Sequence, residues 1–96
     1  MDEDSCWQKL AILRVQVDAA PDDPALRCDF ARAWAHLKVW KQVIRELRHA
    51  QALADVGSEV WKEATYMLGR LYEHAGKLNE AQAEYEALVE HSQDAE

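Results

Sequence analysis

The sequence is poor in residues that interrupt helices. Of its 96 residues only three are Gly and two are Pro, and no run of alternating β-branched residues predicts a strand. Much of the chain consists instead of Ala, Leu, Glu, Lys, Arg and Gln, which favour helices. Hydrophobic residues make up 49% of the chain and charged residues 30%. This balance excludes intrinsic disorder and predicts one small all-α domain over residues 1–96.

Cysteines and long apolar runs are also scarce. The two cysteines, Cys6 and Cys28, are too few for a disulfide framework, so we expect both to be reduced. No stretch is apolar for long enough to cross a bilayer, and the acidic start, residues 1–4, is unlike a signal or transit peptide. These absences predict a cytoplasmic protein, or a soluble domain of a larger protein, with no direct insertion into a membrane.

Negative charge dominates the ends of the chain and positive charge its centre. The net charge is −7, which argues against nucleic acid as a partner because nucleic-acid-binding surfaces are basic overall. Residues 25–54 nevertheless hold six basic and two acidic side chains, whereas residues 55–96 hold three basic and ten acidic. The basic centre leaves room for a local anionic ligand.

Turn signals divide the chain into helical segments. Asp23 is a predicted N-cap, Pro24 suits the first turn of the helix that follows it, and Ser58 is a second predicted N-cap. We assign Ser5 and Asn79 as the caps of the first and last helices. The links are short, so neighbouring helices are predicted to run antiparallel. The expected helices cover five ranges: 5–19, 24–37, 40–54, 58–74 and 80–91.

The second and third expected helices align with the fourth and fifth at an offset of 38 residues. Large residues meet large ones and small residues meet small ones, which is typical of a repeated helix-turn-helix unit. The matched residues are Phe30-Ala31 with Leu68-Gly69, Trp34 with Tyr72, Trp40 with Leu78, Val43 with Ala81, Leu47 with Tyr85, and Ala50 with Leu88.

The second copy resembles the tetratricopeptide repeat family. The residues that carry the match are Leu68-Gly69, Tyr72, Gly76, Ala81 and Tyr85. The resemblance implies a short right-handed solenoid of stacked antiparallel helical hairpins. Its parts would be a half-repeat over 5–20, repeat one over 24–54 and repeat two over 58–91. It also implies a set of repeat-packing residues: Ala31, Trp34, Val43, Leu47, Leu68, Gly69, Tyr72, Ala81 and Tyr85.

The chain departs from that family at two points. The family's Pro after the second helix is missing from both copies, where Asp55 and Gln93 stand instead. The usual period is about 34 residues, and the period here is longer by about one helical turn. We therefore expect an extra turn at the start of the helix that begins at Ser58.

The resemblance implies a non-catalytic scaffold, adaptor or chaperone subunit that holds a peptide or a partner helix in a concave groove. The Arg and the His of each copy lie four residues apart, so both side chains share one helix face. Arg suits carboxylates, which favours acidic peptides. The alternative is a solvated face on which Arg70 pairs with Glu73 or Glu63. The implied groove residues are Cys28, Arg32, His36, Tyr66, Arg70 and His74.

Two more specific functions are not supported by motifs. The carboxylate clamp of chaperone-tail-binding members is absent, because Cys28, Arg32 and Tyr66 stand where those members have Lys or Asn. No Gly-rich phosphate loop, HExxH or CxxC occurs, so no catalytic residue, cofactor or metal is predicted. The spacing of the set Cys6, Cys28, His36 and His74 matches no standard zinc site.

Other surfaces stay open as contacts. A basic face on the third helix (Lys38, Lys41, Arg45 and Arg48) would touch a membrane or an acidic partner, or simply be solvated. The first helix carries Trp7 and Ile12, which leaves open self-association through it or continuation into further repeats. The alternative function is a self-associating assembly scaffold or the soluble arm of a larger membrane-associated complex. Trp61 is a candidate exposed contact. The last helix, with Val89 as its main outward apolar residue, is expected to be a polar terminus.

Overall fold

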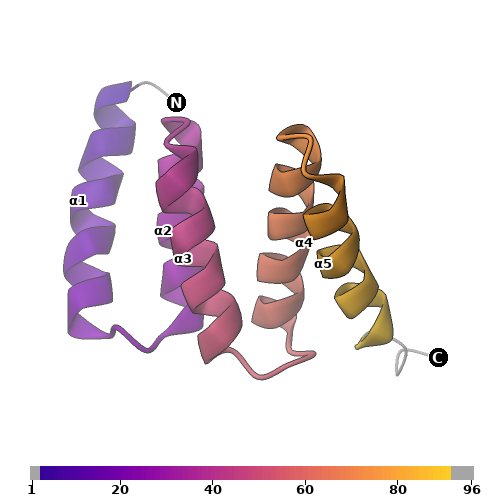
Figure 1. Ribbon diagram of the computed structural model, residues 1–96. Coiled ribbons are helices and arrows are strands. Elements are labelled where there is room, and N and C mark those ends of the chain that lie inside the picture. The colour runs from indigo at the N-terminus through magenta and orange to yellow at the C-terminus, as the bar shows by residue number, and fades with distance from the viewer. Residues whose placement is uncertain (1–2, 92–96) are drawn as a thin grey trace.

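The computed structural model describes residues 3–91 of the chain, and within that range every regular element is an α-helix. Consecutive helices run antiparallel (Figure 1), which confirms the predicted all-α class and helix order. Each helix packs on the next one along the chain, and α2 also contacts α4. The helices are α1 (Glu3–Ala19), α2 (Pro24–His36), α3 (Trp40–Leu53), α4 (Glu59–His74) and α5 (Leu78–Glu90).

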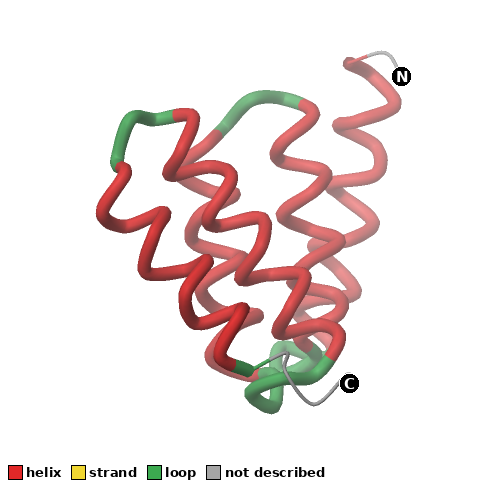
Figure 2. The backbone as a smooth tube through the Cα atoms, turned by 90° about the vertical axis from the view of Figure 1, so that its right-hand side faces the viewer, coloured by secondary structure: helices red, strands yellow, loops and turns green. Residues whose placement is uncertain are grey.

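The turns lie at the two ends of the bundle. Those after α2 and α4 are at one end and those after α1 and α3 are at the other, so the helices stand side by side (Figure 2). The principal extents are 41 × 29 × 20 Å. No helix within residues 3–91 is both long enough and apolar enough to cross a membrane.

Two helix starts follow local signals in the sequence. The Asp23 carboxylate accepts hydrogen bonds from the amides of Ala25 and Leu26, at 3.0 and 3.3 Å, directly before Pro24 opens α2. Ser58 Oγ accepts from the Trp61 amide at 3.2 Å and caps α4. Both predicted N-caps are confirmed, since each side chain replaces a partner that the first helical turn lacks.

Two other predicted caps are wrong. α1 already begins at Glu3, so Ser5 lies inside the helix. α5 begins at Leu78, so Asn79 also lies inside its helix, and the residue before it, Lys77, makes no side-chain cap hydrogen bond. The Lys77 amide instead donates to the Tyr72 carbonyl at 2.8 Å, and this tight turn starts α5 early.

The core consists of two clusters that meet at Trp34. The larger cluster joins α2 and α3 to α4 and α5, and Leu47 and Leu68 at its centre are fully buried. The smaller one joins α1 to α2 through Leu10, Leu13, Val17, Phe30 and Ala33. Burying a Leu side chain stabilises the fold by about 2 kcal/mol, so these clusters explain why the hairpins hold together.

Arg27 links α2 to α3 through a partly buried ion pair. Its Nη1 lies 2.9 Å from Glu46 Oε1, and the two side chains are only 16% and 7% exposed. Its Nε also donates to the Pro21 carbonyl at 3.3 Å. A carboxylate with so little solvent contact requires a partner, so the pair fixes how α2 and α3 align.

A second polar cluster links α3 to the last hairpin. Arg48 Nη2 donates to the Tyr72 hydroxyl at 2.8 Å, and its Nη1 lies 3.0 Å from Glu84 Oε2. Gln51 Nε2 donates to Thr65 Oγ1 at 3.0 Å and to Glu84 Oε1 at 2.9 Å. Burial acts to lower the pKa of Arg48, but the hydrogen bond to Tyr72 and the charge of Glu84 outweigh it and raise that pKa. The cluster therefore joins α3, α4 and α5.

Candidate protein-binding surface

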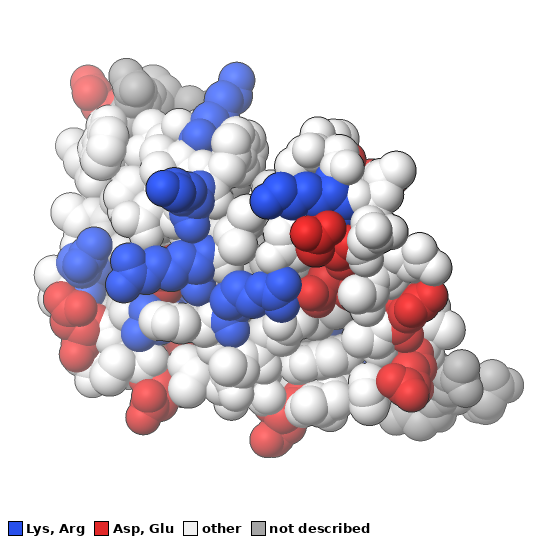
Figure 3. Space-filling view, viewed as in Figure 1, with Lys and Arg blue, Asp and Glu red and all other residues white. Residues whose placement is uncertain are grey.

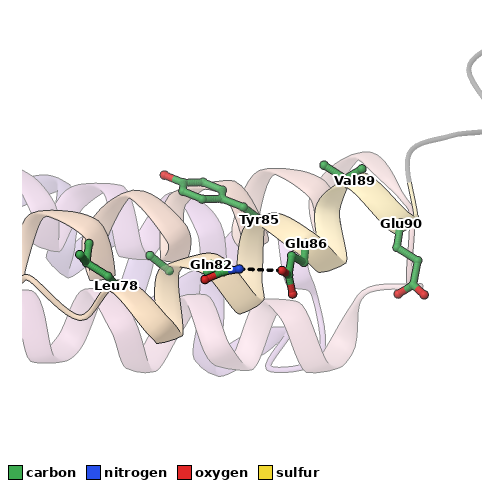
Figure 4. Close-up of a pocket in the computed structure, with 7 residues that line it drawn as sticks. Leu78, Gln82, Tyr85, Glu86, Val89 and Glu90 are labelled. Atoms are coloured by element: carbon green, nitrogen blue, oxygen red, sulfur yellow. Dashed lines mark hydrogen bonds between the residues drawn. The ribbon is translucent and has the colours of Figure 1, made fainter.

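An open apolar groove runs along the outer side of α5. Leu78 and Val89 are 65% and 61% exposed, and Tyr85 lies half-buried between them. In Figure 4, Tyr85 and Val89 point the same way, and Gln82 donates a hydrogen bond to Glu86 beside them. We call this feature of about 600 Å³ the α5 groove, and its lining is Leu78, Ala81, Gln82, Tyr85, Glu86, Val89 and Glu90.

The α5 groove follows from the spacing of apolar residues in α5. Leu78, Tyr85 and Val89 are separated by seven and four residues, so they share one side of the helix. Ala81 and Glu84 are buried on the side that packs inward. The expectation that Val89 is the main outward apolar residue of this helix was incomplete, because Leu78 is exposed and Tyr85 half-buried on the same side, beside the exposed Gln82 and Glu86.

Tyr66 and Arg70 of α4 extend this surface. The rings of Tyr66 and Tyr85 lie 6.4 Å apart, centroid to centroid. Arg70 Nη1 donates to the Tyr66 hydroxyl at 3.1 Å, and the guanidinium sits 5.8 Å from the centroid of the Tyr66 ring. This hydrogen bond raises the pKa of Arg70. Within residues 3–91 Arg70 forms no salt bridge. The charge of Glu73 also acts to raise its pKa, but no carboxylate contacts the guanidinium, which is exposed to a partner.

Tyr85 stays a neutral hydrogen-bond donor. Its hydroxyl donates to Glu73 Oε1 at 2.9 Å. Burial, and then the hydrogen bond to Glu73, raise the pKa of Tyr85. Glu73 is thereby engaged with Tyr85, and it is not the ion-pair partner that the sequence suggested for Arg70.

Arg32 has quite different surroundings from Arg70. It pairs with Asp29 on its own helix at 2.8 Å and with Glu63 on α4. Its charge is therefore already balanced by two carboxylates, one of which ties α2 to α4. The two predicted Arg-His pairs thus differ, because Arg32 serves packing between helices whereas Arg70 faces outward.

The other predicted groove residues are spread over the molecule. Cys28 is only 1% exposed and belongs to the core, so its place in the groove set was wrong. Burial raises the pKa of its thiol. His36 is exposed at the end of α2. His74 is exposed too, and it lines a separate apolar cavity of about 470 Å³ with Trp40, Ile44, Leu71 and Ala75.

The basic face lies over the middle of the molecule. Figure 3 shows Lys and Arg side chains gathered around α3, which lies in front of α2 in that orientation. Lys38, Lys41, Arg45 and Arg48 are all exposed, although Arg48 also bonds inward to Tyr72. Contact of this face with a membrane or an acidic partner stays a prediction.

The tryptophans divide between core and surface. Trp61 is 5% exposed and packs edge-on against His91, 5.4 Å away between centroids, so its role as an exposed contact was wrong. Trp7 is 52% exposed and stacks edge-on with Trp34 at 6.3 Å. Ile12 on the same helix is 60% exposed, which leaves an apolar face on α1 as well.

Within residues 3–91 no three His, Cys, Asp or Glu side chains gather in a way that could hold a metal ion. No protein-family model matches this chain, and comparison with curated proteins and with solved structures finds no similar protein. The α5 groove and its Tyr66–Arg70 flank are therefore interpreted from their own geometry.

Proposed function

We propose that this chain is a non-catalytic protein-binding module built from two tetratricopeptide-type hairpins, α2–α3 and α4–α5, preceded by the single helix α1. The proposal is supported by the environments of the aligned residues. Ala31 and Gly69 are both buried, and so are Val43 and Ala81. These two pairs of matched positions have the same burial, which supports a repeated packing unit.

The binding role rests on one observation, the exposed α5 groove. Exposed apolar patches on soluble domains mark sites of interaction, and Tyr and Arg are enriched among the residues that contribute most to binding. The groove places Leu78, Tyr85 and Val89 beside Tyr66 and Arg70. Arg70 is the residue that favours an acidic partner, since Arg32 is already paired with Asp29 and Glu63.

Paired substitutions test the role of the groove. Leu78→Gln/Val89→Gln removes the two most exposed apolar side chains of the groove, and Ile12→Gln/Val15→Gln removes two from α1 that are 60% and 68% exposed. We expect the α5 variant to lose the proteins that the wild-type chain captures from a cell lysate, and the α1 variant to retain them. One captured protein is then purified and its affinity for all three chains is measured.

Two results would count against the groove as the binding site. The first is equal affinity of the wild type and the α5 variant for the purified partner. The second is loss of affinity in the α1 variant alone, which would favour the α1 face. Circular dichroism of each variant confirms that the helices are intact, since all four residues are exposed.

Self-association is the second candidate function, and the exposure of Ile12 and Val15 on α1 favours it. Light scattering of the purified chain measures the molar mass in solution. A dimer that becomes a monomer on Ile12→Gln/Val15→Gln would support association through α1. A monomer at high concentration would leave partner binding as the function.

A further inference from the structure

The packing of α4 against the α2–α3 hairpin shows how a hairpin of this fold binds a further helix. Arg32 of α2 pairs with Glu63 of α4, and Ile44 of α3 lines the same cavity as Leu71 of α4. α4 brings to this contact apolar residues spaced as i, i+4, i+7 and i+11, with Glu63 at i+3. They are Val60, Ala64, Met67 and Leu71, all of which belong to the larger core cluster or pack against it.

Within residues 3–91 no helix packs over the matching surface on α4–α5. In the 38-residue correspondence, Arg70 stands at the place of Arg32, and Tyr85 at the place of Leu47. Leu47 is fully buried, whereas Tyr85 is half-buried and lines an open groove. Arg32 has a carboxylate on the incoming helix, and Arg70 has none within residues 3–91. A helix with a carboxylate near its start would supply to α4–α5 the contacts that α4 supplies to α2–α3.

We infer that the α4–α5 hairpin receives an amphipathic helix of a partner protein in the way that α2–α3 receives α4. This inference rests on the proposed function and specifies its ligand. The partner helix carries apolar residues at i, i+4, i+7 and i+11 and Asp or Glu at i+3, where the side chain reaches Arg70. The apolar residues fill the α5 groove.

A second charge follows from the difference between the two hairpins. Glu86 stands at the place of Arg48, and Arg48 bonds to Tyr72, which is at i+12 when Val60 is i. The partner helix therefore carries Lys or Arg at i+12, opposite Glu86. An acidic start and a basic end also suit the helix dipole, so the two charges orient the bound helix.

A designed peptide tests this mode with the full chain. The peptide has the 16-residue length of α4, keeps Val60, Glu63, Ala64, Met67 and Leu71, carries Lys at the Tyr72 position, and has Ala or Gln elsewhere. Its ends are blocked and it carries a fluorophore, so anisotropy gives the dissociation constant. We expect binding to the wild-type chain and about fivefold weaker binding to the Arg70→Glu variant, the loss that corresponds to one ion pair at a surface.

The charge-reversed peptide gives the sharper readout. With Glu63→Lys in the peptide, affinity for the wild type is expected to fall about fivefold and affinity for Arg70→Glu to recover. Lys41→Glu on the chain is the matched control, since it makes the same change in net charge at an exposed position of α3. It is expected to change the affinity by less than about twofold.

The inference is overturned if the peptide fails to bind, or if it binds Leu78→Gln/Val89→Gln as tightly as the wild type. The proposed function survives that result when the same double substitution still abolishes binding of the purified cellular partner, so the two failures are distinguishable. A wild-type dimer that dissociates on Leu78→Gln/Val89→Gln would make a second copy the occupant and would also overturn the inference.

Discussion

Gly69 lies directly against the ring of Tyr85, where an added β-carbon would come within 2.6 Å of Cε1 and 2.9 Å of Cδ1. Residue 69 therefore cannot carry a side chain unless the ring moves. The ring is restrained, because its hydroxyl donates to Glu73 at 2.9 Å and the Tyr85 side chain packs against the larger core cluster. The missing side chain of Gly69 thus sets how closely α4 and α5 approach.

The effect of Gly69→Ala on the free energy of unfolding is expected to depend on residue 85. We expect the substitution to destabilise the wild type and to stabilise the Tyr85→Ala variant. In the wild type the overpacking, about 1–3 kcal/mol, exceeds the gain in helix propensity of about 1 kcal/mol, so we expect a net loss of about 1 kcal/mol. In a Tyr85→Ala background the clash is absent and the same substitution is expected to stabilise by about 1 kcal/mol. Urea unfolding of the four chains measures both effects, and equal effects in the two backgrounds would contradict the contact.

The ion pair between Arg27 and Glu46 gives a second prediction. Glu46→Leu is expected to lower the free energy of unfolding by about 3 kcal/mol, because it leaves the largely buried Arg27 without its carboxylate. Arg27→Met/Glu46→Leu is expected to recover most of that loss, since it removes both charges together. If the loss in the double variant equals the sum of the losses from Arg27→Met alone and Glu46→Leu alone, the two residues do not interact.

Glu84 is expected to contribute more to the free energy of unfolding than Glu86, two residues later. Glu84→Ala removes one acceptor of Gln51 and the ion-pair partner of Arg48, which costs about 2 kcal/mol because two interactions near the core are lost. Glu86→Ala is the matched control on the exposed side of α5, with an expected change within about 0.5 kcal/mol. Thermal or urea unfolding compares the two, and equal destabilisation would rule out a special role for the Glu84 cluster.

The buried thiol of Cys28 predicts an alkaline effect on stability. Burial raises its pKa above the ordinary value of 9.0, with Arg32 opposing and Asp29 reinforcing the shift. The folded state therefore favours the neutral thiol. The resulting stability is fully present below the unfolded pKa and is lost as the pH rises through the folded pKa.

We expect the urea midpoint of the wild type to fall more steeply than that of Cys28→Ala above about pH 9. The comparison uses the slopes with pH, because Cys28→Ala also changes core packing at every pH. Parallel curves for the two chains would contradict a shifted thiol. Cys28 is also expected to react with a thiol reagent only when the fold opens, since it is almost wholly buried.

Signals that act within one helical turn were sufficient to predict most of the helix boundaries. Asp23 and Ser58 cap the helices that directly follow them. Asn79 failed because its helix start is set by the Lys77 amide, which reaches back to Tyr72. The capping preference of a residue does not include such a competing backbone bond, and only the folded turn reveals it.

Contacts between distant segments could not be predicted from the sequence. The burial of Trp61 depends on His91, thirty residues later, and the pairing of Arg32 depends on Glu63 across two helices. The predicted groove set included Tyr66 and Arg70 but missed Leu78. The helical spacing of Leu78, Tyr85 and Val89 in the sequence could have predicted that Leu78 belongs to this surface.

Sequential packing has a consequence for how the chain is made. Apart from α2 with α4, each helix packs mainly on the helix that precedes or follows it, so the contacts are short in sequence. Chains of this kind fold fast, because little loop entropy is lost for each contact. During synthesis the α1–α2 pair is complete before α4 exists, so the protein can build its core in the order of translation.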